Sequence, residues 1–258
     1  MARLVFTSMG TVISVLRPGP ELPASLERAV REEFTSRDAR FSSYRADSEL
    51  SRVARGDLSS LTAGPEFRAT LHRALGWEEA TAGAFSVRSP DGILDLAGIV
   101  KAEAIEGAGN ILKQTGLHDW LLNAGGDVLV GGHNYGAPWK VGIVDPEDRS
   151  KVLAGIELLP GQRALATSGV SERGSHIWSA SGRTPFSQVS VLAPDIVTAD
   201  VLATAIMAGG HRTLEAACSR WDIDALCVTV TGELLTTPRL RLQLQVKPTH
   251  DGALPTSA

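Results

Sequence analysis

Hydrophobic residues recur at helical spacing in several stretches of the chain, most clearly in residues 197–210. Thr198 is placed to cap the start of this helix, and Gly209 and Gly210 are placed to end it. Further helices are predicted over residues 26–41, 67–82, 95–115 and 214–221. The apolar stripe of the helix predicted over residues 197–210 consists of Val201, Leu202, Ala205, Ile206 and Met207.

Alternating or short apolar runs predict strands between these helices. The first is expected over residues 6–16, with Gly10 as a bulge. Because strands and helices do not alternate one for one, we expect an α+β fold with mixed or antiparallel sheets and packed helices. The length suits one domain over residues 1–247, followed by a disordered polar tail at 248–258. The other strands are predicted at 120–122, 128–130, 139–144, 152–159, 163–167, 188–193, 225–230 and 240–246.

Composition narrows the class of protein. The net charge of −4, without a basic patch, disfavours nucleic acid as a partner. No apolar run reaches the roughly 18 residues that a membrane span needs. The start of the chain lacks a secretion signal and a lipobox cysteine, so we expect a cytoplasmic protein. Cys218 and Cys227 are expected to be reduced core residues.

Asp200 and Thr204 lie four residues apart, so on a helix their side chains stack on one face. A carboxylate and a hydroxyl held in this way offer two hard oxygens to a cation such as Mg²⁺. The alternative is that Asp200 only complements the helix dipole and Thr204 only bonds to a backbone carbonyl.

Two glycine-containing segments have the composition of ligand sites. In DLAGIVK, Asp95 and Lys101 flank Gly98 at the start of a helix, where phosphates bind well. An N-capping aspartate and a surface lysine are the alternative. NAGGD, residues 123–127, favours a plain hairpin over a close backbone approach to a nucleotide.

His176 precedes two apolar residues in the polar segment TSGVSERGSHIW, residues 167–178. Such a histidine can act as a general base near neutral pH, or it can be structural. The sequence has no GxSxG, HExxH, CxxC, GxGxxG or Walker A motif, which disfavours hydrolase triads, zinc sites and Rossmann or P-loop folds.

Taken in order, these segments resemble the ApbE family of flavin transferases (FAD:protein FMN transferases). No single motif is specific, but the ordered set is, and it spans nearly the whole chain. The matching stretches are MGT at 9–11, FSSYRADSEL at 41–50, GAF at 83–85, DLAGIVKAEAIE at 95–106, NAGGDV at 123–128, ATSGVSER at 166–173, SHI at 175–177 and ADVLAT at 199–204.

The resemblance implies a T-fold-like α+β domain that cleaves FAD with Mg²⁺ and attaches FMN to a threonine or serine of an acceptor flavoprotein, releasing AMP. His176 would deprotonate the acceptor hydroxyl. Mg²⁺ would be bound by the Gly98 carbonyl, Asp200 and Thr204. FAD would contact Met9, Tyr44, Phe85, Ser86, Val87, Asp95, Lys101 and Ile177.

The chain also departs from the family pattern. Ser86 stands where the family has an aspartate, and a segment after it is reduced to residues 88–94. Ala102 and Glu103 replace a glycine and an aromatic residue. No clear copy of the family's acceptor motif is present, so self-flavinylation is not expected. Two alternatives therefore stay open: a Mg²⁺-dependent FAD diphosphatase that releases FMN and AMP, and a non-catalytic FAD-binding protein.

Overall fold

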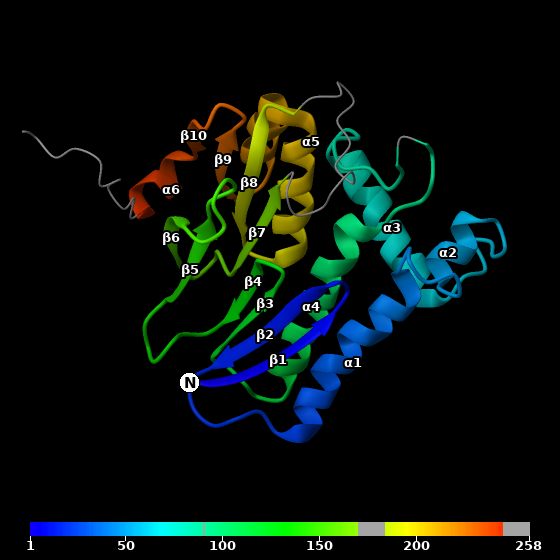
Figure 1. Cartoon of the computed structure of the whole chain (residues 1–258), viewed down its shortest axis with the longest axis horizontal. Helices are drawn as coiled ribbons and strands as arrows, with labels where there is room; N and C mark the ends of the chain where they lie inside the picture. Colours follow the sequence, from blue (N-terminus) through cyan, green and yellow to red (C-terminus); the bar gives the residue numbers. More distant parts are fainter. Residues whose placement is uncertain (90, 170–183, 245–258) are drawn as a thin grey trace, which may run out of the picture.

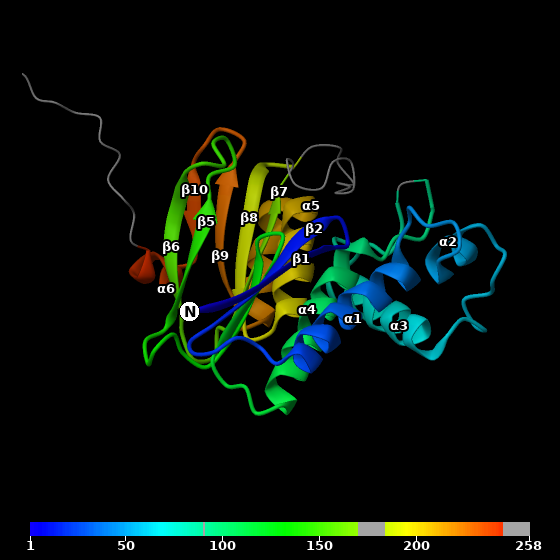
Figure 2. The ribbon, with the colours of Figure 1, turned by 60° about the horizontal axis from the view of Figure 1, so that its bottom comes forward.

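A central antiparallel sheet carries its longer helices on one face and a β-hairpin, with a short helix over residues 238–243, on the other (Figures 1 and 2). The structure is a computed structural model that describes residues 1–89, 91–169 and 184–244. Within these residues the central sheet has eight strands in the order β1-β2-β3-β4-β7-β8-β9-β10. The α+β class with antiparallel sheets is therefore confirmed. The predicted limits of the domain at 1–247 stay a prediction, and the tail at 248–258 lies outside the described residues.

The strands of the central sheet are β1 (Ala2–Ser8), β2 (Thr11–Arg17), β3 (Trp120–Ala124), β4 (Asp127–Gly131), β7 (Ala164–Gly169), β8 (Phe186–Ala193), β9 (Asp224–Thr229) and β10 (Leu234–Thr236). The hairpin consists of β5 (Trp139–Val144) and β6 (Val152–Leu158). The helices are α1 (Ala24–Phe41), α2 (Glu49–Ala54), α3 (Pro65–Ala80), α4 (Ala97–Gln114), α5 (Ile196–Arg220) and α6 (Pro238–Gln243).

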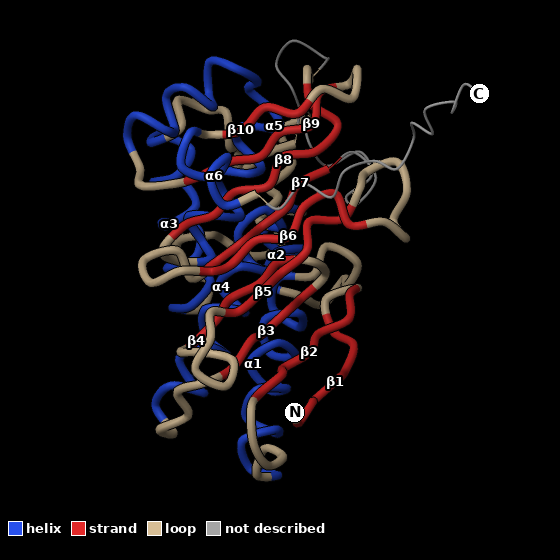
Figure 3. The backbone as a smooth tube through the Cα atoms, turned by 90° about the vertical axis from the view of Figure 1, so that its left-hand side faces the viewer, coloured by secondary structure: helices blue, strands red, loops and turns tan. Residues whose placement is uncertain are grey.

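Two apolar cores separate the layers. The larger lies between the sheet and the helices, where α5 packs on β7 and β8 and α4 packs on α5 and α1. The smaller lies beneath the β5–β6 hairpin, which faces the viewer in Figure 3. β7 contributes to both: Ala164 and Ala166 belong to the helix side and Leu165 to the hairpin side. This alternation is what a strand buried on both faces requires.

The first strand was predicted wrongly as one bulged strand over 6–16. It is a hairpin in which β1 and β2 pair from Ala2–Arg17 to Ser8–Thr11. Met9 and Gly10 form its two-residue turn with φ angles of 52° and 69°. Two positive φ angles match the twist of a tight hairpin, and a non-glycine residue at the first position leaves little turn signal in the sequence.

The long helix α5 contains both helices predicted in this part of the chain. Gly210 interrupts the helical dihedral angles with φ 68° and ψ −152°, so the first helical segment ends at the glycine pair, as predicted, and a second segment continues α5 beyond the kink. The predicted cap is also one turn out. Asp195, not Thr198, caps α5, because its carboxylate accepts hydrogen bonds from the Thr198 amide and hydroxyl, each at 2.8 Å.

The strand predicted at 240–246 is wrong, because residues 238–243 form the short helix α6. Pro238 occupies its first turn, where proline is favoured because its missing amide proton would have no partner within the helix. Asp224 anchors this end of the chain by accepting hydrogen bonds from Gln162, Thr237 and Arg239. Burial alone raises the pKa of Asp224, but these three hydrogen bonds outweigh burial and lower it.

The two cysteines differ in environment. Cys227 is buried, as predicted, and burial raises the pKa of its thiol to about 12. Cys218 is exposed, so its expected core position is wrong. Among the described residues, no helix has the length and apolar character that a membrane crossing requires.

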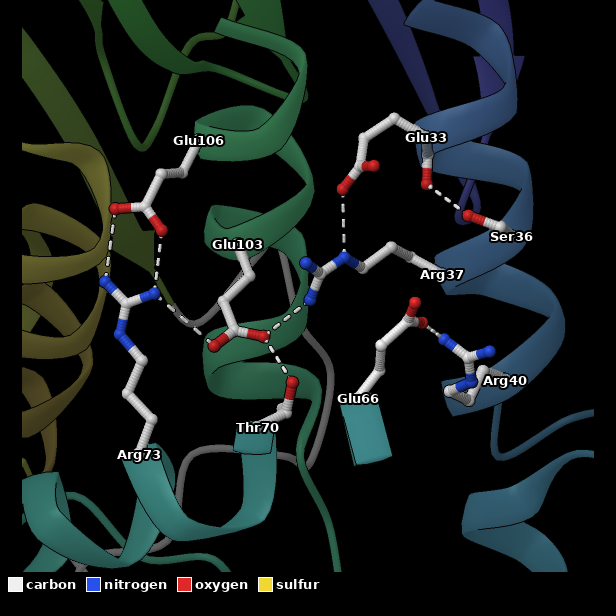
Figure 4. Close-up of polar contacts among 9 residues, drawn as sticks. All are labelled: Glu33, Ser36, Arg37, Arg40, Glu66, Thr70, Arg73, Glu103 and Glu106. Carbon is white, nitrogen blue, oxygen red and sulfur yellow. Dashed lines mark hydrogen bonds and ion pairs between the residues drawn. The ribbon is translucent and has the colours of Figure 1, made fainter. Parts of the chain in front are cut away.

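A buried carboxylate joins three helices on the far side of α4 from the sheet (Figure 4). Glu103, with 5% of its surface exposed, accepts hydrogen bonds from Arg37 of α1 at 2.7 Å and Thr70 of α3 at 2.6 Å. Arg73 of α3 lies 3.5 Å from the same carboxylate and pairs more closely with Glu106. Charge-assisted bonds of this kind stabilise more than neutral ones when they are shielded from water.

We predict that Glu103→Gln lowers the free energy of unfolding by about 1–2 kcal/mol, because an amide weakens two charge-assisted bonds in a buried position. Urea unfolding with an unchanged m-value measures this loss. The matched control is Glu106→Gln, whose carboxylate is 32% exposed; we expect it to cost less than about 1 kcal/mol. Equal losses for the two variants would contradict the prediction.

Candidate functional site

The carboxylate and hydroxyl predicted on α5 lie as their spacing requires. Asp200 is fully buried, with 0% of its surface exposed. Thr204 lies one turn later and is the partly exposed position in an otherwise buried run from 199 to 207. The Oγ1 atom of Thr204 lies 3.2 Å from the Oγ atom of Ser168, at the end of β7. The two side chains therefore link α5 to the end of β7, on the face of the sheet that the helices cover.

Lys101 projects from α4 onto the sheet. Its ammonium lies 2.5 Å from the carboxylate of Asp127, the first residue of β4, and the two side chains are 19% and 1% exposed. The other oxygen of Asp127 accepts the amide proton of Thr167 at 3.0 Å. Asp127 thus connects α4, β4 and β7 at one place, next to the Ser168–Thr204 contact.

The NAGGD segment forms the hairpin that the sequence favoured. Gly125 and Gly126 form the turn between β3 and β4 with φ angles of 63° and 98°. A side chain on Gly125 would also place its Cβ atom 2.6 Å from the hydroxyl of Thr11. The turn therefore brings Asp127 onto the sheet at the point where the β1–β2 turn approaches it.

The start of α4 holds two further predicted residues. The carboxylate of Asp95 accepts the amide proton of Ala97 at 2.8 Å, but the N-cap residue of α4 is Leu96, one position later than the sequence alternative placed it. Gly98 lies in the first turn, where a Cβ atom would come within 2.8 Å of the Phe85 ring. Phe85 is 2% exposed. A larger residue at position 98 would therefore push the Phe85 ring away from the helix start.

The segment after Phe85 is held by α3. A single carboxylate oxygen of Glu78 accepts the hydroxyl proton of Ser86 at 2.9 Å and the amide proton of Val87 at 3.1 Å. Val87 is buried and lines a cavity of about 570 Å³ together with residues of α2, α3 and the segments at 88 and 91–94. This volume falls in the range of small-molecule sites.

The remaining predicted residues stand apart from these contacts. Met9 lies in the β1–β2 turn and packs on the edge of the larger core. Tyr44 lies on the loop after α1 with 90% of its surface exposed, so its ring is available for stacking. His176 and Ile177 lie outside the described residues.

The proposed donors on α4 and α5 suit a hard divalent cation rather than zinc or a transition metal. Asp200 and Thr204 offer a carboxylate and a hydroxyl, and Gly98 offers a carbonyl. Within the residues that the structure describes, there is no group of three or more His, Cys, Asp or Glu side chains that could hold a metal ion. A magnesium ion usually keeps several water ligands and needs few protein groups, so this set fits Mg²⁺.

The sequence alone does not identify two residues at this place, Asp127 and Ser168, as site residues. The sequence marks Asp127 as the end of a turn, and the one further signal is that a carboxylate at the start of an apolar strand needs a partner. Ser168 was assigned to a loop after a strand ending at 167, whereas β7 continues to Gly169. Only the tertiary structure shows what either side chain contacts.

The sequence comparison decides the family. A model of the ApbE family matches residues 9–91 and 87–227. The chain belongs to the ApbE family. It is 34% identical over 164 residues to the FAD:protein FMN transferase of Rhodobacter capsulatus, and 30% identical over 158 residues to that of Vibrio cholerae. These matches cover 59% and 56% of this chain, but 31% and 47% of the two relatives, so the chain spans less than half the length of either.

Solved structures support the ApbE fold. The flavin transferase ApbE from Vibrio cholerae superposes with a TM-score of 0.79 at 23% identity, covering 94% of this chain and 98% of that one. The ApbE protein of Thermotoga maritima gives a TM-score of 0.79 at 22% identity, covering 93% and 98%. The match to the family model therefore confirms the family resemblance, and these structures confirm the fold.

We predict that Asp127→Ala lowers the free energy of unfolding by about 3 kcal/mol, because it leaves a largely buried ammonium and the Thr167 amide without their carboxylate. Asp127→Asn keeps an acceptor for the amide and should cost about half as much. Chemical denaturation measures both. The control is Glu157→Ala, which removes the exposed pair with Lys140 and should change stability by less than about 0.5 kcal/mol.

Proposed function

We propose that this protein is a Mg²⁺-dependent FAD:protein FMN transferase that releases AMP. The observation that carries the proposal is the α5 pair, a fully buried carboxylate one turn from a partly exposed hydroxyl, in a chain of the ApbE family. The names of the curated relatives support the same activity. The acceptor is proposed to be a flavoprotein that presents a serine or threonine.

In this proposal FAD is bound along the starts of α4 and α5. Lys101 supplies positive charge to the diphosphate while Asp127 holds its ammonium in place. The amide groups at the start of α4 favour the same anion. Tyr44 provides an exposed ring for stacking, and Met9, Asp95 and the segment Phe85–Val87 form further parts of the nucleotide site. Ile177 completes this set.

Asp200, Thr204 and the Gly98 carbonyl are proposed to hold Mg²⁺, which would neutralise charge on the diphosphate when bound. The acceptor hydroxyl oxygen forms a bond to the phosphorus of the FMN half. The bond from that phosphorus to the bridging oxygen breaks, and the bridging oxygen leaves with AMP. His176 is proposed to take the hydroxyl proton, which is worth on the order of a hundred- to ten-thousand-fold in rate.

We predict that Asp200→Asn lowers FMN transfer by about a hundredfold or more, because the site loses its one charged oxygen ligand. Mass spectrometry of an acceptor domain after incubation with the protein, FAD and Mg²⁺ measures the transfer. Asp195→Asn is the matched control on the same helix, since asparagine also caps helices well; it should stay near the wild-type rate. Wild-type labelling by Asp200→Asn would refute the metal assignment.

The same experiment without an acceptor separates the other two functions. A transferase should release little AMP until the acceptor is added. Rapid release of AMP and FMN without acceptor would identify an FAD diphosphatase. FAD that stays bound and intact in Mg²⁺, with or without acceptor, would identify a binding protein.

A further inference from the structure

The hydroxyl of Ser168 is buried on the helix side of the sheet, facing α5. Side chains of β7 alternate between the two cores, and Ala164 and Ala166 mark the helix side. Ser168 shares their side by this alternation and is 0% exposed. Its Oγ atom lies 3.2 Å from the Oγ1 atom of Thr204. A buried polar group needs a hydrogen-bond partner, and within the described part of the chain Thr204 provides one for Ser168.

The contact matters for what Thr204 can do. A threonine hydroxyl has one proton and two lone pairs. To bind a cation, its oxygen must turn a lone pair toward the ion, so its proton must point elsewhere. On a helix the usual acceptor for that proton is the carbonyl four residues earlier, which ties the hydroxyl to its own helix. Ser168 offers an acceptor on another element instead.

We propose that Ser168 is a positioning residue that accepts the Thr204 proton and so turns a lone pair of Thr204 toward a divalent cation shared with Asp200. The inference rests on the metal site in the proposed function and adds a residue outside its ligand set. Groups that orient metal ligands in this way typically change metal affinity by about 10- to 100-fold when they are removed.

The chain provides a matched control in Ser190. This serine is also 0% exposed and lies on β8, next to β7. Its hydroxyl lies 2.8 Å from that of Thr167, and Leu192, two residues on, belongs to the hairpin-side core. Ser190→Ala therefore removes the same group, at the same burial, from the opposite face of the same sheet.

The test measures Mn²⁺ binding to the full chain in the presence of FAD, by the electron paramagnetic resonance signal of the free ion. We expect Ser168→Ala to raise the Kd for Mn²⁺ about tenfold or more. Ser190→Ala should change it less than about twofold, with a similar shift in melting temperature. In a Thr204→Val background, adding Ser168→Ala should have no further effect on the Kd.

The outcomes separate this inference from the proposed function. If wild-type protein has no Mn²⁺ site that Asp200→Asn removes, the metal site and this inference both fail. If that site exists and Ser168→Ala leaves its Kd unchanged, or weakens it equally in the Thr204→Val background, only the role of Ser168 is wrong. Should Ser168→Ala not fold, Ser168→Cys gives the same test, because a thiol is a weak acceptor of similar shape.

Discussion

The helices α4 and α5 bury their apolar faces against one face of the sheet and against each other, and polar groups inside that layer must be satisfied within it. This constraint determines the polar contacts between elements. Lys101 of α4 meets Asp127 of β4, and Thr204 of α5 meets Ser168 of β7. Because Asp127 also accepts the Thr167 amide, the two contacts are coupled through adjacent residues of one strand. The helices are therefore fixed relative to the sheet where the candidate site lies.

Local signals in the sequence were sufficient for the elements that carry this layer. The apolar stripe of α5 repeats with the helical period, and Asp200 and Thr204 fall on one face of it because they are four residues apart. The NAGGD hairpin was predictable because two successive glycines adopt positive φ without strain. In both cases the information is contained within a few consecutive residues, so these elements could be predicted without knowing the tertiary structure.

The errors arose where such local signals are absent or misleading. Met9 takes a positive φ in the β1–β2 turn, and methionine gives no hint of a turn. In α6 the alternating leucines imitate a strand, although Leu240 is buried and Leu242 is 90% exposed on a helix. The partners Ser168 and Thr204, and Asp127 and Thr167, are 36 and 40 residues apart. One sequence does not state which strand lies beside which helix, so these contacts could not be predicted.

The family resemblance implies a different residue at position 103, and the structure shows what Glu103 does there. Residues two positions apart on a helix project about 200° from each other. Lys101 points to Asp127 and the sheet, so Glu103 points to the opposite side of α4. There its carboxylate accepts hydrogen bonds from Arg37 and Thr70 (Figure 4). An aromatic residue at this position would bury apolar area, whereas glutamate cross-links α1, α3 and α4 through charge. Glu103 therefore holds the outer helices, while Lys101 on the other side of α4 pairs with Asp127 of the sheet.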